Sequence, residues 1–289
     1  MEANPSAAAQ SVMFPTMRHG LGVNSWFFKN TNPSVADWQS IASAGFTEAE
    51  IVPPNLAKTK DMFTYLEEMY GRMVEAGLRV GSLHLPWGRS FDVSNTNFIL
   101  RARGMAILKR MLDFCETKGI PIAVIHGSMD GIADEERCKR MGIAYNSIKE
   151  LGAYAKQHGV ALAVENLPRR ALGNCSAEIL QLTGYGKNAY ICFDNNHLAH
   201  ESALSFLRST APYVVTTHLS DYDGENEKHW RIGTGAVDWP LLFDYFEDFH
   251  YNGRYIFEFK ECSAPDKSCV TPKQLMHIIN GYLQQRSLL

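Results

Sequence analysis

The sequence predicts an α/β protein built as a single (β/α)8 TIM barrel. From residue 18 onward, short apolar runs alternate with longer amphipathic stretches, and there are eight of each. A length of 289 residues is normal for one such barrel. Five of the expected strands follow a glycine of the kind that ends a helix, at Gly45, Gly77, Gly119, Gly159 and Gly253. Eight strand-then-helix units in one chain favour a closed barrel of parallel strands.

The expected elements follow one another in strict alternation. Short apolar runs predict strands at residues 21–25, 47–52, 79–84, 122–126, 161–165, 190–194, 214–218 and 255–258. Amphipathic stretches predict helices at residues 34–44, 61–76, 97–117, 135–158, 177–182, 203–208, 239–249 and 272–285. Since no linker or low-complexity tract interrupts residues 18–289, we expect one catalytic domain over that range, preceded by a flexible tail at residues 1–17.

Composition argues against several classes of partner. The chain is 45% hydrophobic and 20% charged, as is usual for a globular enzyme, and its formal net charge is -3. That charge gives no general attraction to nucleic acid, so no nucleic acid is expected as a partner. The N-terminus lacks the basic and apolar regions of a signal peptide, and no stretch reaches the roughly 18 apolar residues of a membrane span. We therefore expect a cytoplasmic protein with no membrane partner.

The six cysteines are scattered and form no CxxC pair. This distribution is typical of reduced, mostly buried thiols in a cytosolic protein. Cys262 and Cys269 are close enough in sequence to pair, but two free thiols are the simpler interpretation.

Four strand candidates in the second half of the chain each end on one residue able to bind a metal ion. These residues are Glu165, Asp194, His218 and Glu258. A lone acid or histidine after a strand is usually a turn residue or a helix cap, whereas four in succession at the same strand end are harder to explain that way. In a barrel the carboxyl ends of the strands converge on one mouth, so these side chains are expected to meet there. Three carboxylates and one imidazole suit a divalent cation.

The stretches SLHLPWG, VIHG, VENLPRR, CFDNNH, HLSDYDGENEKHWRIGTGAVDW and FEFK, in this order and spacing, resemble the xylose-isomerase-like barrel superfamily. That superfamily contains sugar isomerases, sugar-phosphate isomerases and epimerases, and endonuclease-four-type nucleases. The resemblance covers nearly the whole chain after the tail. It implies a xylose-isomerase-like TIM barrel acting on a small-molecule sugar or sugar phosphate.

In the ketose 3-epimerases of this superfamily, one divalent metal ion is held by four residues that match Glu165, Asp194, His218 and Glu258. The resemblance implies that Glu165 and Glu258 also act as acid and base on opposite faces of the sugar. The chemistry is sound, because a proton next to a carbonyl leaves at neutral pH only if the developing enediolate is stabilised. Mn, Mg, Co and Zn all tolerate such ligands.

Further residues are candidates for binding the substrate. His197 matches a histidine that contacts substrate in related epimerases, while His84 and His126 end two other strands. His229 and Arg231 follow on a polar loop where the epimerases supply an arginine, and the register places His229 nearer to that position. Trp87 stands beside a strand end, where an indole can stack on a sugar. Arg169 and Arg170 follow Glu165 closely and could hold a phosphate or carboxylate.

Two other functions stay open at this point. An endonuclease-four-type zinc phosphodiesterase has a three-zinc ligand set that resembles the following residues: His84, His126, Glu165, Asp194, His197, His218, His229 and Glu258. Against it, the aspartate of that family two residues before the last histidine is replaced by Glu227, and the net charge is acidic. The other function is a non-catalytic barrel that binds a polyol, although none of the four ligands is lost. Oligomeric state is open, a homo-oligomer included.

Overall fold

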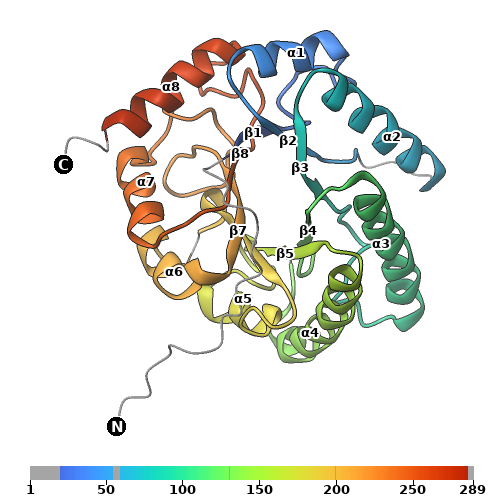
Figure 1. The fold of residues 1–289 in the computed structure, drawn as a ribbon. Helices are drawn as coiled ribbons and strands as arrows, with labels where there is room; N and C mark the ends of the chain where they lie inside the picture. The colour runs from blue at the N-terminus through green and yellow to red at the C-terminus, as the bar shows by residue number, and fades with distance from the viewer. Residues whose placement is uncertain (1–19, 55–58, 130, 199, 286–289) are drawn as a thin grey trace.

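The computed structural model describes residues 20–54, 59–129, 131–198 and 200–285. Its eight strands close into a barrel in the order β1-β2-β3-β4-β5-β6-β7-β8, and every neighbouring pair is parallel. The helices form a ring outside the strands (Figure 1). The predicted fold class is therefore confirmed. The tail predicted at residues 1–17 lies outside the described residues.

Each expected strand is present, and its ends lie within one residue of the predicted ends. The strands are β1 (Leu21–Asn24), β2 (Glu48–Ile51), β3 (Arg79–His84), β4 (Ile122–His126), β5 (Ala161–Glu165), β6 (Tyr190–Asp194), β7 (Val214–Leu219) and β8 (Arg254–Phe257). The last strand stops one residue before Glu258. Backbone pairing nevertheless continues, because Glu258 N donates to Leu219 O at 2.9 Å.

The helices also match, although several begin earlier or end later than expected. They are α1 (Val35–Ser43), α2 (Thr59–Glu75), α3 (Phe98–Lys118), α4 (Asp134–Gln157), α5 (Ser176–Thr183), α6 (Ala203–Thr210), α7 (Trp239–Asp248) and α8 (Pro272–Gln285). Two short 3-10 turns add η1 (Asn195–His197) directly after β6 and η2 (Ala211–Tyr213) before β7.

Four of the five glycines predicted to end a helix have the expected left-handed backbone conformation. Gly45, Gly77, Gly119 and Gly159 all have positive φ angles, between 67 and 105°. The expectation for Gly253 is wrong, since the left-handed residue after α7 is His250, with φ 54°. Its backbone N–H donates to Glu247 O at 2.8 Å and so closes the helix end. The left-handed residue that ends α7 therefore lies three residues before Gly253.

Two apolar layers hold the barrel together. The larger lies between strands and helices and contains fully buried side chains such as Trp38, Phe193 and Phe243. The smaller fills the barrel interior and consists of Ile122, Val124, Ala161, Ala163 and Cys192. Because side chains alternate along a strand, residues two positions further along face the same interior. The interior apolar layer therefore leads directly to His126, Glu165 and Asp194.

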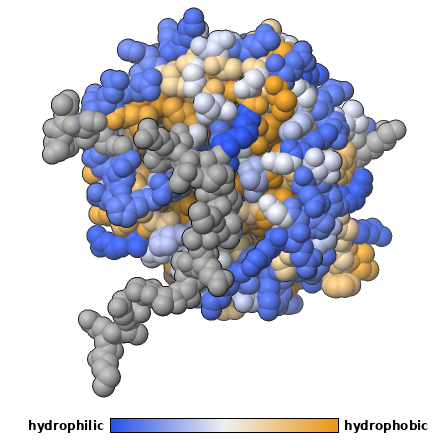
Figure 2. Space-filling model, viewed as in Figure 1, coloured by the Kyte–Doolittle hydropathy of each residue, from blue (hydrophilic) through white to orange (hydrophobic). Residues whose placement is uncertain are grey.

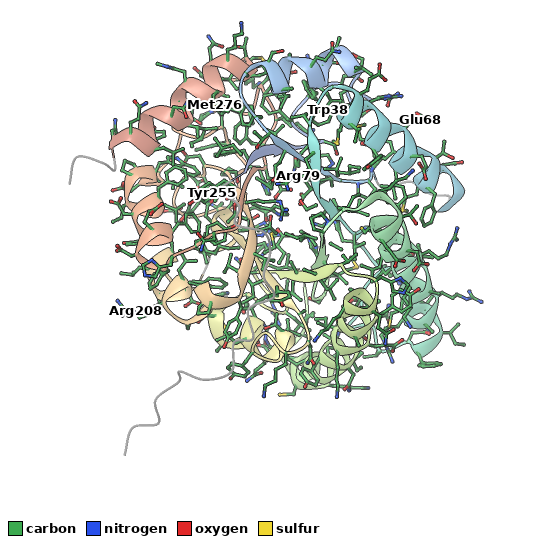
Figure 3. The ribbon with its side chains drawn as sticks, in the orientation of Figure 1. Trp38, Glu68, Arg79, Arg208, Tyr255 and Met276 are labelled. Carbon is green, nitrogen blue, oxygen red and sulfur yellow. A yellow bond between two sulfur atoms is a disulfide. The ribbon has the colours of Figure 1, made fainter. Side chains whose placement is uncertain are left out.

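Charged residues close the end of the barrel where the strands begin. Glu48 is fully buried at the start of β2 and forms ion pairs with Arg79 and Arg254. In Figure 3, Arg79 lies toward the middle of the ring of strands, whereas Glu68 of α2 and Arg208 of α6 lie at the outer edge of the ring of helices. These ion pairs sit at the strand starts, and the candidate functional residues sit at the strand ends.

The outer surface is mostly polar on the face in view. Figure 2 shows hydrophilic residues around its rim, with hydrophobic residues visible between them. Among the described residues, no helix is both long enough and apolar enough to cross a membrane.

The expectation of two free thiols at Cys262 and Cys269 is wrong. They form a disulfide in the loop between β8 and α8, with their Cα atoms 3.9 Å apart. The loop folds back on itself, since Val270 N donates to Glu261 O at 2.8 Å. That bond places residues 262 and 269 opposite each other. Of the free cysteines, Cys115 and Cys192 are buried as expected, while Cys138 is exposed.

Gly152→Ala is expected to destabilise the fold by about 1–3 kcal/mol, the range measured for overpacked cores. Gly152 lies on the buried face of α4, and an added Cβ would stand 1.8 Å from the backbone oxygen of Asn188. Gly142→Ala on the same helix is the control, because nothing lies within 4 Å of its added Cβ. Urea unfolding should show it equal to or more stable than the natural chain. Equal midpoints for the two variants would contradict the close packing of α4.

Candidate active site

Each strand supplies one inward-facing polar side chain at or beside its carboxyl end. In strand order these are Asn24, Glu50, His84, His126, Glu165, Asp194, His218 and Glu258. The register places Asp194 directly opposite His218 and His126 directly opposite Glu165. The barrel therefore gathers eight polar groups into a single layer at its mouth.

Glu165, Asp194, His218 and Glu258 converge as the sequence predicts. Each offers a donor atom, and the four donor atoms all lie within 4.8 Å of one another. His218 Nδ1 stands between two of the carboxylates, 3.2 Å from Glu165 Oε1 and 3.1 Å from Glu258 Oε2. All four side chains are buried, none more than 5% exposed.

The unsatisfied atoms of this cluster fit a divalent cation. Among the described residues, neither Asp194 Oδ2 nor His218 Nδ1 has a hydrogen-bond partner. His218 Nδ1 lies within ion-pair distance of two carboxylates, but the angles are not those of a hydrogen bond. Buried polar groups without partners are costly, and a cation at their common point would satisfy them together. Oxygen and imidazole donors in this ratio suit Mn, Mg, Co or Zn.

The pKa values of the cluster residues shift in opposite directions. Burial raises the pKa of Asp194 to about 7, and the neighbouring Glu165 and Glu258 add to the rise against His197. Burial also opposes ionisation of Glu258, yet His218 and His229 lower its pKa to about 2. Burial by itself lowers the pKa of His218, but the acidic groups around it raise that pKa well above its usual value. In the protein without metal, these acidic groups thus favour the protonated form of His218.

His84 and His126 both contact Glu165. The Nε2 atom of each lies 3.1 Å from Glu165 Oε2. The Trp87 ring is stacked on His126, with centroids 5.4 Å apart, and meets His84 edge to face at 5.0 Å. Trp26 packs edge to face on Trp87 at 5.3 Å. Two indoles and two imidazoles therefore form one aromatic wall of the mouth.

His197 and His229 lie on the other side of the cluster, around Glu227. His197 Nδ1 stands 3.3 Å from Asp194 Oδ2 and 3.4 Å from Glu165 Oε1. Its Nε2 faces Glu227 Oε1 at 3.7 Å, and His229 Nε2 lies 3.1 Å from the same oxygen. Donor atoms of these three residues also lie within 4.8 Å of one another, close enough to share a cation. The His197 and His229 imidazoles, with help from Arg169, hold the pKa of Glu227 far below its usual range.

Arg231 faces a different part of the molecule. Its Nη2 donates to Ser268 Oγ at 3.5 Å, and the side chain lines a surface pocket with Lys273 and His277 of α8. No contact described for Arg231 reaches the four-residue cluster. The substrate role predicted for it thus stays a prediction.

Sequence reasoning did not identify two members of the polar layer. Glu50 on β2 is fully buried, accepts a hydrogen bond from Ser82 Oγ at 2.7 Å and lies 3.0 Å from His218 Nε2. Asn24 on β1 donates to Glu258 Oε1 at 3.1 Å. Both follow the inward-facing parity of their strands, and that parity was the available signal. Their contacts orient the metal-ligand candidates His218 and Glu258.

A single buried carboxylate organises the loop that carries Glu227 and His229. Asp221 accepts hydrogen bonds from four backbone N–H groups, those of Tyr222, Gly233, Thr234 and Val237, and from the indole of Trp239, at 2.9–3.1 Å. Its own backbone pairs with Trp230 in both directions at 2.8 Å. Gly235 has to be a glycine, because an added Cβ would stand 2.2 Å from Tyr222 O. Asp221 therefore fixes the backbone of this loop both before and after Glu227 and His229.

Comparisons with known proteins agree with this fold. A family model described as Xylose isomerase-like TIM barrel matches residues 38–276. The chain belongs to this family. Among curated members it is similar to L-ribulose-5-phosphate 3-epimerase UlaE of Escherichia coli, with 25% identity over 205 residues that cover 70% of this chain and 72% of that protein.

Solved structures of the family share the fold. A D-tagatose 3-epimerase-like protein superposes with a TM-score of 0.75 at 18% identity, covering 93% of this chain and 98% of the other. The 3-keto-D-glucoside 4-epimerase YcjR from E. coli superposes with a TM-score of 0.73 at 17% identity, covering 92% of this chain and 100% of the other. At these identities the likeness establishes the barrel and its topology.

Proposed function

We propose that this protein is a divalent-metal-dependent epimerase of a sugar or sugar phosphate, with Glu165 and Glu258 as its acid and base. The observation that carries the proposal is the pair of buried glutamates on either side of His218 Nδ1, 3.2 and 3.1 Å away. Two carboxylates at one centre can serve two faces of a substrate, as epimerisation requires. The 3-epimerase among its relatives supports the same reaction type.

Glu165, Asp194, His218 and Glu258 would hold the metal ion. When bound, the ion would supply Lewis-acid stabilisation of the negative charge that develops on the sugar oxygens. One glutamate carboxylate removes the proton from the carbon next to the carbonyl and becomes a carboxylic acid. The other glutamate starts as the carboxylic acid, donates its proton to the opposite face of that carbon and becomes a carboxylate. The two glutamates exchange roles when the reaction runs in the reverse direction.

Neighbouring residues fix the geometry of both glutamates. Asn24 Nδ2 donates to Glu258 Oε1, which leaves Oε2 directed toward the cluster. Glu165 Oε2 is contacted by His84 and His126, and Oε1 faces His218 and His197. A carboxylate held at a fixed position loses little entropy when it transfers a proton. Trp87 and Trp26 offer apolar faces on which a sugar can stack.

The test is to measure epimerisation and metal content on the same sample. Ketoses and ketose phosphates should be incubated in D2O with each of the four metals, and deuterium incorporation at the epimerised carbon followed by NMR. Exchange at that carbon that depends on metal supports the proposal. Turnover without deuterium incorporation, or full activity after chelation, would overturn it.

A second function is favoured by one observation, the presence of two further ligand groups beside the first. His84, Glu165 and His218 form one group, and His197, Glu227 and His229 form the other. A cluster of several zinc ions would suit a phosphodiesterase of the endonuclease-four type. Against this function, the net charge of -3 disfavours binding of duplex DNA, and the Arg169 guanidinium contacts Glu227.

Changing His84, His126 and His229 together to Gln is expected to leave one bound metal ion and to lower kcat/KM. The reason is that none of the three belongs to the four-residue cluster, so they act as donors to substrate hydroxyls. Elemental analysis gives the metal count, and steady-state kinetics with a ketose gives the rate. Loss of more than one equivalent of zinc from the triple variant would instead favour the phosphodiesterase.

A further inference from the structure

Glu227 is the centre of a set of basic side chains that come from three separate segments. Arg169 reaches it from the loop after β5, His197 from η1 after β6, and His229 from its own loop after β7. The Arg169 guanidinium binds Glu227 Oε2, while the two imidazoles face Oε1 at 3.7 and 3.1 Å. We call Arg169, His197 and His229 the basic cradle.

The basic cradle adjoins the candidate metal site. His197 belongs to both, since its Nδ1 faces Asp194 and Glu165 and its Nε2 faces Glu227. A group held in the cradle would therefore be separated from the proton-transferring carboxylates only by the imidazole ring of His197. That separation places the cradle within reach of the same substrate molecule.

The backbone of the cradle is fixed at Arg169 and carries a positive φ angle at two of its three residues. Arg169 and His229 both adopt positive φ angles, 54 and 48°, which is unfavourable for residues other than glycine. The carbonyl of Arg169 accepts bonds from Asn174 Nδ2 at 2.7 Å and His200 Nε2 at 3.1 Å. Strained backbone that is fixed by several contacts is found most often at ligand sites. The Glu227 side chain is 25% exposed and the Arg169 side chain 56% exposed, so solvent reaches the centre of the cradle.

We propose that the basic cradle is the subsite for an anionic oxygen group of the substrate, a phosphate or a carboxylate, and that Glu227 fills it when no substrate is bound. The proposal deepens the proposed function and rests on it for the reaction, but not for the binding. A guanidinium and two ring N–H groups match the donors that phosphate and carboxylate oxygens accept. The Glu227 carboxylate already contacts these donors, which shows that the cradle can accommodate a carboxylate group.

A metal ion is the competing occupant, because His197, Glu227 and His229 could also share a cation. The Arg169 guanidinium disfavours it. A second cation would have to share Glu227 with a group that is permanently charged, and the two positive charges would repel each other. Three basic side chains around one carboxylate leave the cradle suited to an anion.

The test uses the full-length protein and inorganic phosphate as the probe, with affinity measured by isothermal titration calorimetry. Arg169→Met is expected to weaken phosphate binding about 10-fold or more, the usual loss for a charge-assisted hydrogen bond. Arg208→Met is the control. Arg208 is an exposed arginine of α6 at the outer edge of the molecule (Figure 3), away from the cradle. The control variant should bind phosphate as the natural protein does.

Glu227→Gln gives the sharper result. If Glu227 occupies the subsite, neutralising it frees the cradle, so phosphate should bind several-fold more tightly than to the natural protein. Elemental analysis is run on the same samples. Loss of a metal equivalent without tighter phosphate binding would show that Glu227 is a metal ligand and would overturn the proposal. Unchanged affinity in both Arg169→Met and Glu227→Gln would overturn it as well, as phosphate would then bind elsewhere.

The source of the anionic group is separated by kinetics. A ketose phosphate, a sugar acid with a keto group and a neutral ketose are compared with the natural protein and Arg169→Met. A selective rise in KM for one charged substrate identifies that group as the natural occupant. An equal rise for the neutral ketose would contradict an anion subsite. Because phosphate binding needs no turnover, failure of the proposed epimerase reaction leaves the calorimetric result separately readable.

Discussion

Glu258→Gln is expected to lower kcat by at least about 100-fold while most of the metal stays bound. An amide oxygen can still accept the hydrogen bond from Asn24 and can still coordinate a cation, but it cannot take up or release a proton at neutral pH. The rate and the metal content must be measured on the same preparation, by kinetics with a ketose and by elemental analysis. The ratio of the two losses is the informative quantity.

Asp223→Asn is a suitable control for that experiment. Asp223 is an exposed acid on the loop after β7, and an amide oxygen there can still accept from the backbone N–H groups of Glu225 and Asn226. The control removes one negative charge from the same side of the barrel without touching the cluster. If the activity of Glu258→Gln falls only in proportion to its metal content, Glu258 is a ligand and has no role in proton transfer.

Hydrophobic periodicity predicts most of the fold from the sequence alone. Each strand was recognisable as a short apolar run, and strand parity explains why single residues such as Glu165 and Asp194 meet at one mouth. A strand can direct only alternate side chains inward, so one ligand from each of four strands is the expected pattern. The same parity includes Glu50 and Asn24. Their polar neighbours in EAEI and VNS hid the signal, because the direction of each side chain depends on barrel register.

Loop conformation is the part that the sequence could not supply. The pairing of Arg169 with Glu227 joins residues 58 positions apart on two different loops, and each loop contains a residue with a positive φ angle, Arg169 and His229. The disulfide between Cys262 and Cys269 depends on a backbone bond between Val270 and Glu261. No periodicity encodes such contacts, since they follow from turns whose geometry is set by tertiary packing.

Arg231 and His229 illustrate the same limit within a single loop. They are two residues apart, yet His229 faces the mouth and Arg231 faces α8. The loop does not keep the alternation of a strand, because Asp221 draws the backbone of Gly233, Thr234 and Val237 toward itself. Side-chain direction in this segment is decided by one buried carboxylate.

Asp194→Asn is expected to stabilise the metal-free protein and to reduce the stabilisation that metal provides. In the natural protein without metal, Asp194 is a fully buried carboxyl beside two glutamates, and its Oδ2 has no hydrogen-bond partner among the described residues. Burial raises its pKa from 3.8 to about 7. A carboxyl whose pKa is raised by folding destabilises the folded state as it ionises, so the metal-free protein should lose stability as pH rises from about 4 to about 7. The asparagine variant should lack that loss.

Addition of metal should then separate the two proteins in the opposite direction. An ion at 100 times its dissociation constant stabilises the natural protein by about 2.7 kcal/mol, which corresponds to several degrees in Tm. The variant lacks one of the four ligands, so its Tm should respond much less to the same ion. Thermal unfolding at pH 8, with and without a chelator, gives all four values. The variant should be the more stable protein after chelation and the less stable one with metal. The reason is that the negative charge of Asp194 destabilises the metal-free protein, whereas the same charge binds the ion when metal is present. Equal metal-induced shifts in both proteins would mean that Asp194 is not a ligand.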